Sequence, residues 1–249
     1  MFDAGASQNW DAVLRWELRM DELVAGQDQK TIFEVLQVFA CAFSHTKKFD
    51  KAGLMWVRCA EACGALKLFS LHVGMLERAG TSFLAGGDSK NAALWFESAR
   101  DVSRENEFVS MESKFCTKLG GAFTEVGRIS EGVEQHRRAW AVAQRVQDGI
   151  SHGRASLERT ALRFLVMSLC EDGQLEEAGT LFTRLREGGT TPRTASSGTT
   201  TCEGVCSTTR ETFQQRPKLF KPHWTSLDST LQCWRIRMPR ERSGQPKAL

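Results

Sequence analysis

Residues 76–99 read LERAGTSFLAGGDSKNAALWFESA. Gly80 is followed three places later by Phe83, so a small and a large side chain share one face of a helix. Two glycines and Asp88 then supply a turn. In the helix that follows, apolar residues recur at spacings of four and three, at Ala92, Phe96 and Ala99. This stretch therefore predicts two helices joined by a short turn.

The same pattern recurs along the chain with a step of 40 residues. Three columns keep this step: Ala12, Ala52, Ala92 and Gly132; Trp16, Trp56, Phe96 and His136; and Phe43, Phe83 and Phe123. A further copy follows 46 residues later, with Ala178 and Phe182. A single helix pair cannot bury its apolar face alone, so neighbouring pairs must stack. The repeat predicts an all-α fold.

The order of small residue, large residue, turn glycine and then Ala-x-x-x-Phe-x-x-Ala resembles the tetratricopeptide repeat (TPR). The step of 40 with longer helices is similar to the subclass found in rapsyn, in Partner-of-Inscuteable-type proteins and in kinesin-light-chain-like repeats. The resemblance implies a right-handed superhelical TPR-like solenoid of antiparallel helix pairs. The chain departs from the family pattern in having no tyrosine, in Gly132 where alanine is usual, and in Leu169 in the aromatic column.

The repeats predict a helical domain over 9–188. It would begin with a lone second helix without its first-helix partner: either another helix caps it, or upstream sequence is missing and the chain is a piece of a longer solenoid. The expected segments are a half repeat at 9–26 and helix pairs at about 30–66, 69–105, 109–147 and 155–187. Residues 189–249 have no apolar periodicity and are rich in Thr, Ser, Arg and Pro, so we expect a disordered C-terminal tail. The abrupt change of composition also fits a read-through or frame-shifted end.

Charge is divided unevenly along the 249 residues, whose net charge is +3. Residues 1–188 carry 23 Lys and Arg against 26 Asp and Glu, and residues 189–249 carry 10 against 4. The tail also interleaves tryptophans such as Trp224 and Trp234 with basic residues. The basic tail predicts, as an alternative function, an adaptor that binds RNA or a membrane surface.

Several kinds of site and segment are not expected. The start of the chain has no signal-peptide pattern, and no window is apolar enough to span a bilayer. The eight scattered cysteines fit a reducing compartment, so we expect a cytoplasmic protein. The subclass resemblance further suggests the cytoskeleton or a cilium.

No arrangement of residues points to catalysis, a cofactor or a metal. Cys59 and Cys63 lie far in sequence from the second pair, Cys202 and Cys206, so packing is the better explanation of Cys59 than zinc. His136 belongs to the aromatic column, and we expect it to be buried for packing. Gly86–Lys90 lacks the P-loop order and is predicted to be a turn between helices.

The TPR resemblance implies a concave groove lined by the outward residues of the first helices. By register, the groove residues are Glu34, Gln37, Cys41, Glu77, Thr81, Leu84, Lys114, Thr117, Thr124 and Arg163. The Lys/Asn/Arg clamp of chaperone-binding members is missing at these positions. We therefore expect a non-enzymatic scaffold or adaptor whose partly acidic groove binds a peptide or helical segment of another protein, within a larger complex. We expect no small-molecule substrate, and neither nucleic acid nor membrane as the main partner.

Overall fold

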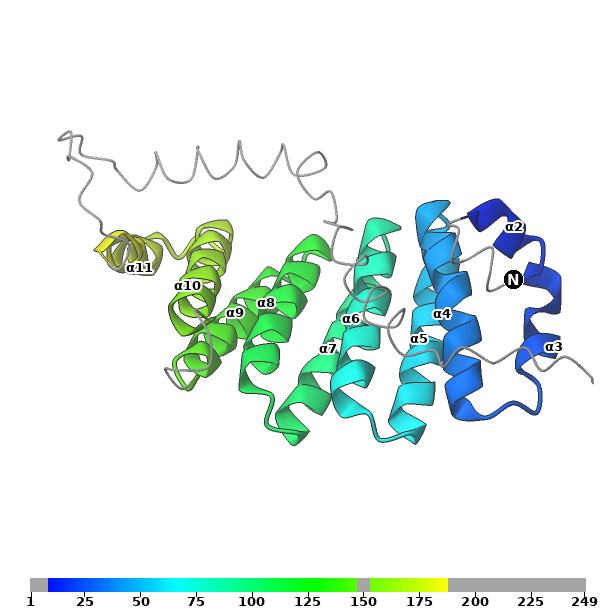
Figure 1. Ribbon diagram of the computed structural model, residues 1–249. Helices are drawn as coiled ribbons and strands as arrows, with labels where there is room; N and C mark the ends of the chain where they lie inside the picture. The colour runs from blue at the N-terminus through cyan, green and yellow to red at the C-terminus, as the bar shows by residue number, and fades with distance from the viewer. Residues whose placement is uncertain (1–8, 147–152, 188–249) are drawn as a thin grey trace, which may run out of the picture. The chain divides into compact units, whose positions relative to one another are not determined.

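The computed structural model describes residues 9–146 and 153–187, which form helices and turns and contain no strand. The helices follow one another in chain order, and consecutive helices pack side by side (Figure 1). Their bounds are α2 Trp10–Leu14, η1 Glu17–Arg19, α3 Met20–Val24, α4 Gln29–His45, α5 Phe49–Ala65, α6 Phe69–Ala85, α7 Ser89–Glu105, α8 Val109–Glu125, α9 Ile129–Ala143, α10 Gly153–Glu171 and α11 Leu175–Glu187. The fold is a solenoid of antiparallel helix pairs, as the repeat pattern predicted.

The 40-residue repeat consists of two halves of equal length. The six helices from α4 to α9 begin 20 residues apart, and the first five of them are each 17 residues long. Each connection uses the same Schellman turn, in which one residue takes a left-handed conformation. In the α4–α5 turn, Lys47 has φ of +59°, and the Lys48 N–H donates to the Phe43 carbonyl at 2.9 Å. The same turn thus ends first helices and second helices alike.

Glycine occupies the left-handed position in some of these turns and a bulkier residue occupies it in others. Gly87 and Gly127 have φ of +84° and +86°, whereas Lys67 adopts +56° with a side chain that strains this conformation. We expect Lys67→Gly to stabilise the fold by about 0.5–1 kcal/mol, because relief of strain exceeds the added entropy of the unfolded chain. Urea unfolding followed by circular dichroism measures this change. Gly87→Ala is the matched control and should destabilise; a loss of stability in Lys67→Gly would contradict the prediction.

The three sequence columns form the core between the helices. The interior copies of the aromatic column are buried: Trp56 and Phe96 are each 1% exposed, and His136 is 3% exposed. A glycine from the neighbouring first helix faces two of them. A Cβ atom at Gly80 would lie 2.6 Å from the Phe96 ring, and one at Gly120 would lie 2.5 Å from His136 Nε2. The small residues therefore make room for the large ones, and the helix backbones approach closely.

The N-terminal segment differs from the expected continuous helix over 9–26. It breaks into α2, η1 and α3, which pack mainly against α4 and form ion pairs with α5, from Glu17 to Lys51 and from Asp21 to Arg58. Interior helices have a neighbour on both sides. With close packing against α4 on one side, this segment buries little apolar surface: Leu18 is 97% exposed, and Trp16, expected in the buried aromatic column, is 38% exposed. Tertiary packing supplies most helix stability, so the helix is not held continuous here.

The later boundaries also differ in part. α9 ends at Ala143, whereas a helix to residue 147 was expected; residues 147–152 lie outside the described ranges. The predicted boundary at 188 and the predicted disordered tail at 189–249 also lie outside them. Among the described helices, none combines the length and the apolar character that crossing a bilayer requires.

Candidate partner-binding face

The predicted groove residues lie on the four first helices α4, α6, α8 and α10. Lys114 and Arg163 are exposed, and the half-buried members are Glu34, Gln37, Glu77, Thr81, Leu84, Thr117 and Thr124. We call the side of these helices that carries the nine residues the first-helix face. The hydroxyls of Thr117 and Thr124 donate to carbonyls one turn earlier in α8, those of Ser113 and Gly120, both at 3.1 Å.

Cys41 is a correction to the predicted set. Its side chain is buried at 8% exposure, so it belongs to the core and does not line the face. Burial raises the pKa of the Cys41 thiol to about 11, although Arg78 opposes the shift. Burial raises the pKa of Cys59 still further, with the neighbouring Cys63 and Cys41 contributing. These thiols are therefore protonated at neutral pH and act as small apolar groups.

Glu77 connects two successive first helices across this face. Its carboxylate on α6 pairs with Lys114 Nζ at 2.7 Å and Lys118 Nζ at 3.3 Å, both on α8. Burial acts to raise the pKa of Glu77, but the two lysines outweigh it and the pKa is lowered. Because the folded-state pKa is depressed, the pairing stabilises the fold near neutral pH and is lost as the pH falls through that pKa. Glu77 therefore does not provide the free acidic surface that the sequence suggested.

Two basic residues on the same face were missed in the sequence. The Arg78 guanidinium lies 4.9 Å from the Trp56 ring centroid, and Lys118 Nζ lies 5.4 Å from that of Phe96. Each cation follows its aromatic by 22 residues, so the two contacts repeat with the solenoid. Each covers an aromatic ring of the preceding second helix with a cation–π contact. A basic residue 22 positions after these two members of the aromatic column is the sequence pattern from which the two contacts could have been predicted.

Two glycines leave the first-helix face open. A Cβ atom built at Gly74 on α6 or at Gly121 on α8 would meet no atom within 4 Å. Gly74 occupies the register position of Glu34 and Lys114, and Gly121 that of Cys41 and Thr81. The face therefore has unfilled space next to the Glu77–Lys114–Lys118 bridge.

Comparison with solved structures supports the architecture. BtubC (BKLC) from P. vanneervenii matches with a TM-score of 0.55 at 14% identity, over 76% of this chain and 78% of that one. A putative kinesin light chain of P. anserina, with nearly identical TPR-like repeats, matches with a TM-score of 0.55 at 13% identity, over 75% and 90%. The chain has a TPR-like fold. No family model and no curated protein matches its sequence.

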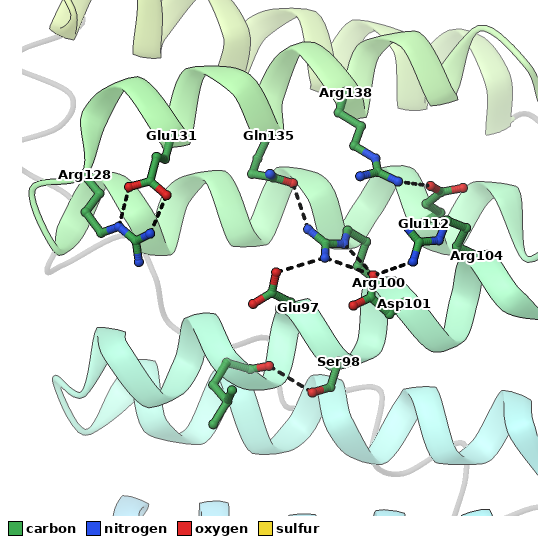
Figure 2. A network of polar contacts seen from close by, with 11 residues as sticks. Glu97, Ser98, Arg100, Asp101, Arg104, Glu112, Arg128, Glu131, Gln135 and Arg138 are labelled. Carbon is green, nitrogen blue, oxygen red and sulfur yellow. Dashed lines mark hydrogen bonds and ion pairs between the residues drawn. The ribbon is translucent and has the colours of Figure 1, made fainter.

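The second helices of this TPR-like solenoid are joined by their own polar network (Figure 2). The Arg100 guanidinium, on a residue 7% exposed, donates to Glu97 at 3.0 Å and Asp101 at 2.9 Å within α7. It also donates to Gln135 Oε1 on α9 at 3.2 Å. Its charge is therefore compensated although it is buried, and the network links neighbouring TPR-like repeats on the side formed by the second helices.

His136 is a buried packing residue of the TPR-like core, as its column predicted. Its Nε2 lies 3.2 Å from the Thr117 carbonyl on α8, which can only accept, so Nε2 carries a proton. Its Nδ1 lies 3.0 Å from the Ser168 hydroxyl on α10, and its ring stacks on Phe164. One histidine thus joins α8, α9 and α10 by hydrogen bonds in place of an aromatic side chain.

The remaining predicted positions lie in the TPR-like core, in a turn between helices, or outside the described residues. Of the predicted turn Gly86–Lys90, the first three residues join α6 to α7 and Ser89 and Lys90 already belong to α7, which Asp88 caps by accepting the Asn91 N–H at 3.0 Å. Cys59 is buried in the small column, and Cys202 and Cys206 lie outside the described residues. Within 9–146 and 153–187, no three His, Cys, Asp or Glu side chains gather as a metal site. The basic, tryptophan-containing tail also lies outside these ranges.

Proposed function

We propose that the chain is a non-enzymatic scaffold that binds a peptide or helical segment of another protein along the first-helix face. The observation that carries this proposal is the open space above Gly74 and Gly121, flanked by the charged and polar residues of α6 and α8. Helical-repeat proteins bind partners on continuous surfaces made by successive repeats. The first-helix face can bind a segment that carries both polar and apolar side chains, because Lys114 and Arg163 are exposed hydrogen-bond donors and Leu84 offers an apolar contact.

Filling the open space tests the proposal without disturbing the core. In Gly74→Trp and Gly121→Trp, the Cβ of the new side chain meets nothing within 4 Å, so we expect the indole to turn outward and circular dichroism to be unchanged. We expect each variant of the full chain to lose the proteins that the unmodified chain captures by proximity labelling. Loss of at least tenfold in captured protein is expected, because an indole blocks the backbone approach of a bound segment.

Leu94→Trp is the matched control, because Leu94 is 51% exposed on the second helix α7. It adds the same indole on a different face and should leave capture intact. Capture that survives both glycine variants would rule out the first-helix face. Glu77→Lys is a poorer test, because it would remove the bridge to α8 and place three cations together.

As part of the same proposal, we place the protein in the cytoplasm. Five cysteines are free thiols in the described residues, and four of them are buried: Cys41, Cys59, Cys63 and Cys116. Proteins that keep buried thiols reduced fit a reducing compartment. Fractionation of cells that express the full chain would test this placement, and recovery from a secreted or membrane fraction would contradict it.

A further inference from the structure

A pocket of about 540 Å³ lies where the end of α7, the start of α8 and the second half of α9 meet. None of its lining residues belongs to the nine of the first-helix face. The pocket lies at the turn that connects the second helix α7 to the next first helix α8. Its polar lining residues are Arg104, Arg138 and Arg145 together with Glu107 and Glu112. Val109 and Val142 supply its apolar lining. Its volume is in the range of sites for small molecules.

The arginines of the pocket have hydrogen-bonding capacity to spare. Arg138 gives one Nη2 contact to Glu112, at 3.3 Å, and Arg104 reaches Asp101 at 3.2 Å (Figure 2). Arg145 forms no ion pair within 9–146 and 153–187. A guanidinium has five N–H donors, so most donors of these three groups remain available. Glu112 is 4% exposed and already paired, so it competes little for them.

The arginines are not part of the repeat's packing pattern. Forty residues earlier, at the equivalent junction of α5, α6 and α7, their positions hold Gly64, Ser98 and Glu105. The helices at that junction stack in the same way without any of the three arginines. Stacking therefore does not explain why three guanidinium groups converge at this one junction.

We propose that this pocket binds a small organic anion carrying phosphate or carboxylate groups. The guanidinium group pairs with both kinds of oxyanion through parallel N–H donors. Arg138 lies on α9 and Arg145 lies two residues beyond the end of that helix, so the two guanidinium groups enter the pocket from different segments and an anion with two charged groups suits them best. Val109 and Val142 would contact its carbon skeleton. This site does not depend on the proposed partner-binding function.

Calorimetric titration of the full chain with pyrophosphate and with citrate, at ionic strength matched by sodium chloride, tests the proposal. We expect saturable binding of one anion per chain. Arg145→Gln should weaken it at least tenfold, because it removes the pocket guanidinium that has no ion pair among the described residues, and it does not touch Glu112. Glu107→Gln should tighten it severalfold, since it removes a carboxylate from the lining. Arg15→Gln, an exposed arginine on another helix end, is the matched control and should change nothing.

The two anions distinguish the chemistry of the ligand. Binding of pyrophosphate alone assigns the site to phosphates, binding of citrate alone assigns it to carboxylates, and binding of both assigns it to oxyanions in general. Absence of saturable binding for both anions would overturn the proposal. Binding that is unchanged in Arg145→Gln would overturn it too, because the anion would then be held elsewhere, as by the basic residues of 189–249.

Discussion

Gly80→Ala is expected to destabilise the fold by about 1–3 kcal/mol, although alanine normally stabilises a helix interior relative to glycine. The new Cβ would lie 2.6 Å from Phe96 Cε1, so the ring or the helix backbone must move. Phe96→Ala should cost about 3–5 kcal/mol, because its ring is 1% exposed and its loss leaves a cavity. The midpoint of urea unfolding, followed by circular dichroism, measures both changes.

Two further variants show whether close packing is the cause. Gly74→Ala in the same helix and Gly121→Ala in the next repeat are matched controls, where a Cβ meets nothing within 4 Å, and they should stabilise by about 0.5–1 kcal/mol. In a Phe96→Leu background, Gly80→Ala should cost less than it does alone, because the flexible leucine can yield. Equal effects of alanine at Gly80 and Gly74 would contradict the packing account.

His136→Ala is expected to cost about 2–4 kcal/mol, whereas His136→Phe should change stability by about 1 kcal/mol or less. Alanine leaves a cavity between Gly120 and Phe164, which contact the histidine ring from α8 and α10. Phenylalanine fills it, since Phe96 occupies the same register position opposite Gly80. Both hydrogen-bond partners keep an alternative: the Ser168 hydroxyl is then free to donate to the Leu165 carbonyl, 3.0 Å away, and the Thr117 carbonyl lies within α8, where it can accept from the helix backbone.

Unfolding of the two His136 variants under the same conditions provides the comparison. A severe loss in His136→Phe would show that the hydrogen bonds, and not the volume of the ring, make this position stable. Ser168→Ala serves as the control, because it removes the hydroxyl that meets Nδ1 while leaving the ring in place.

The repeat architecture was predictable from the sequence because it rests on local signals that recur. A step of 40 in the small and large columns identifies the helices, and the turn residues mark their ends. The burial of Trp56, Phe96 and His136 follows from the same columns, since stacked helix pairs bury whatever side chain occupies those positions. The N-terminal segment packs closely against α4 on one side, and there the predicted continuous helix was wrong.

The candidate sites consist of side chains from different repeats, and a column of equivalent positions in the sequence does not show which of these side chains meet. Register placed Glu77 on the first-helix face, but only the folded chain brings Lys114 and Lys118 to its carboxylate and cancels its charge. Register also assigned Cys41 to that face, although the folded chain buries it. The proposed anion pocket combines residues from three helices and the turns between them, and its arginines are up to 41 residues apart in sequence. Periodicity thus determined the helices and the core, while distances between side chains of different helices were decided only by tertiary packing.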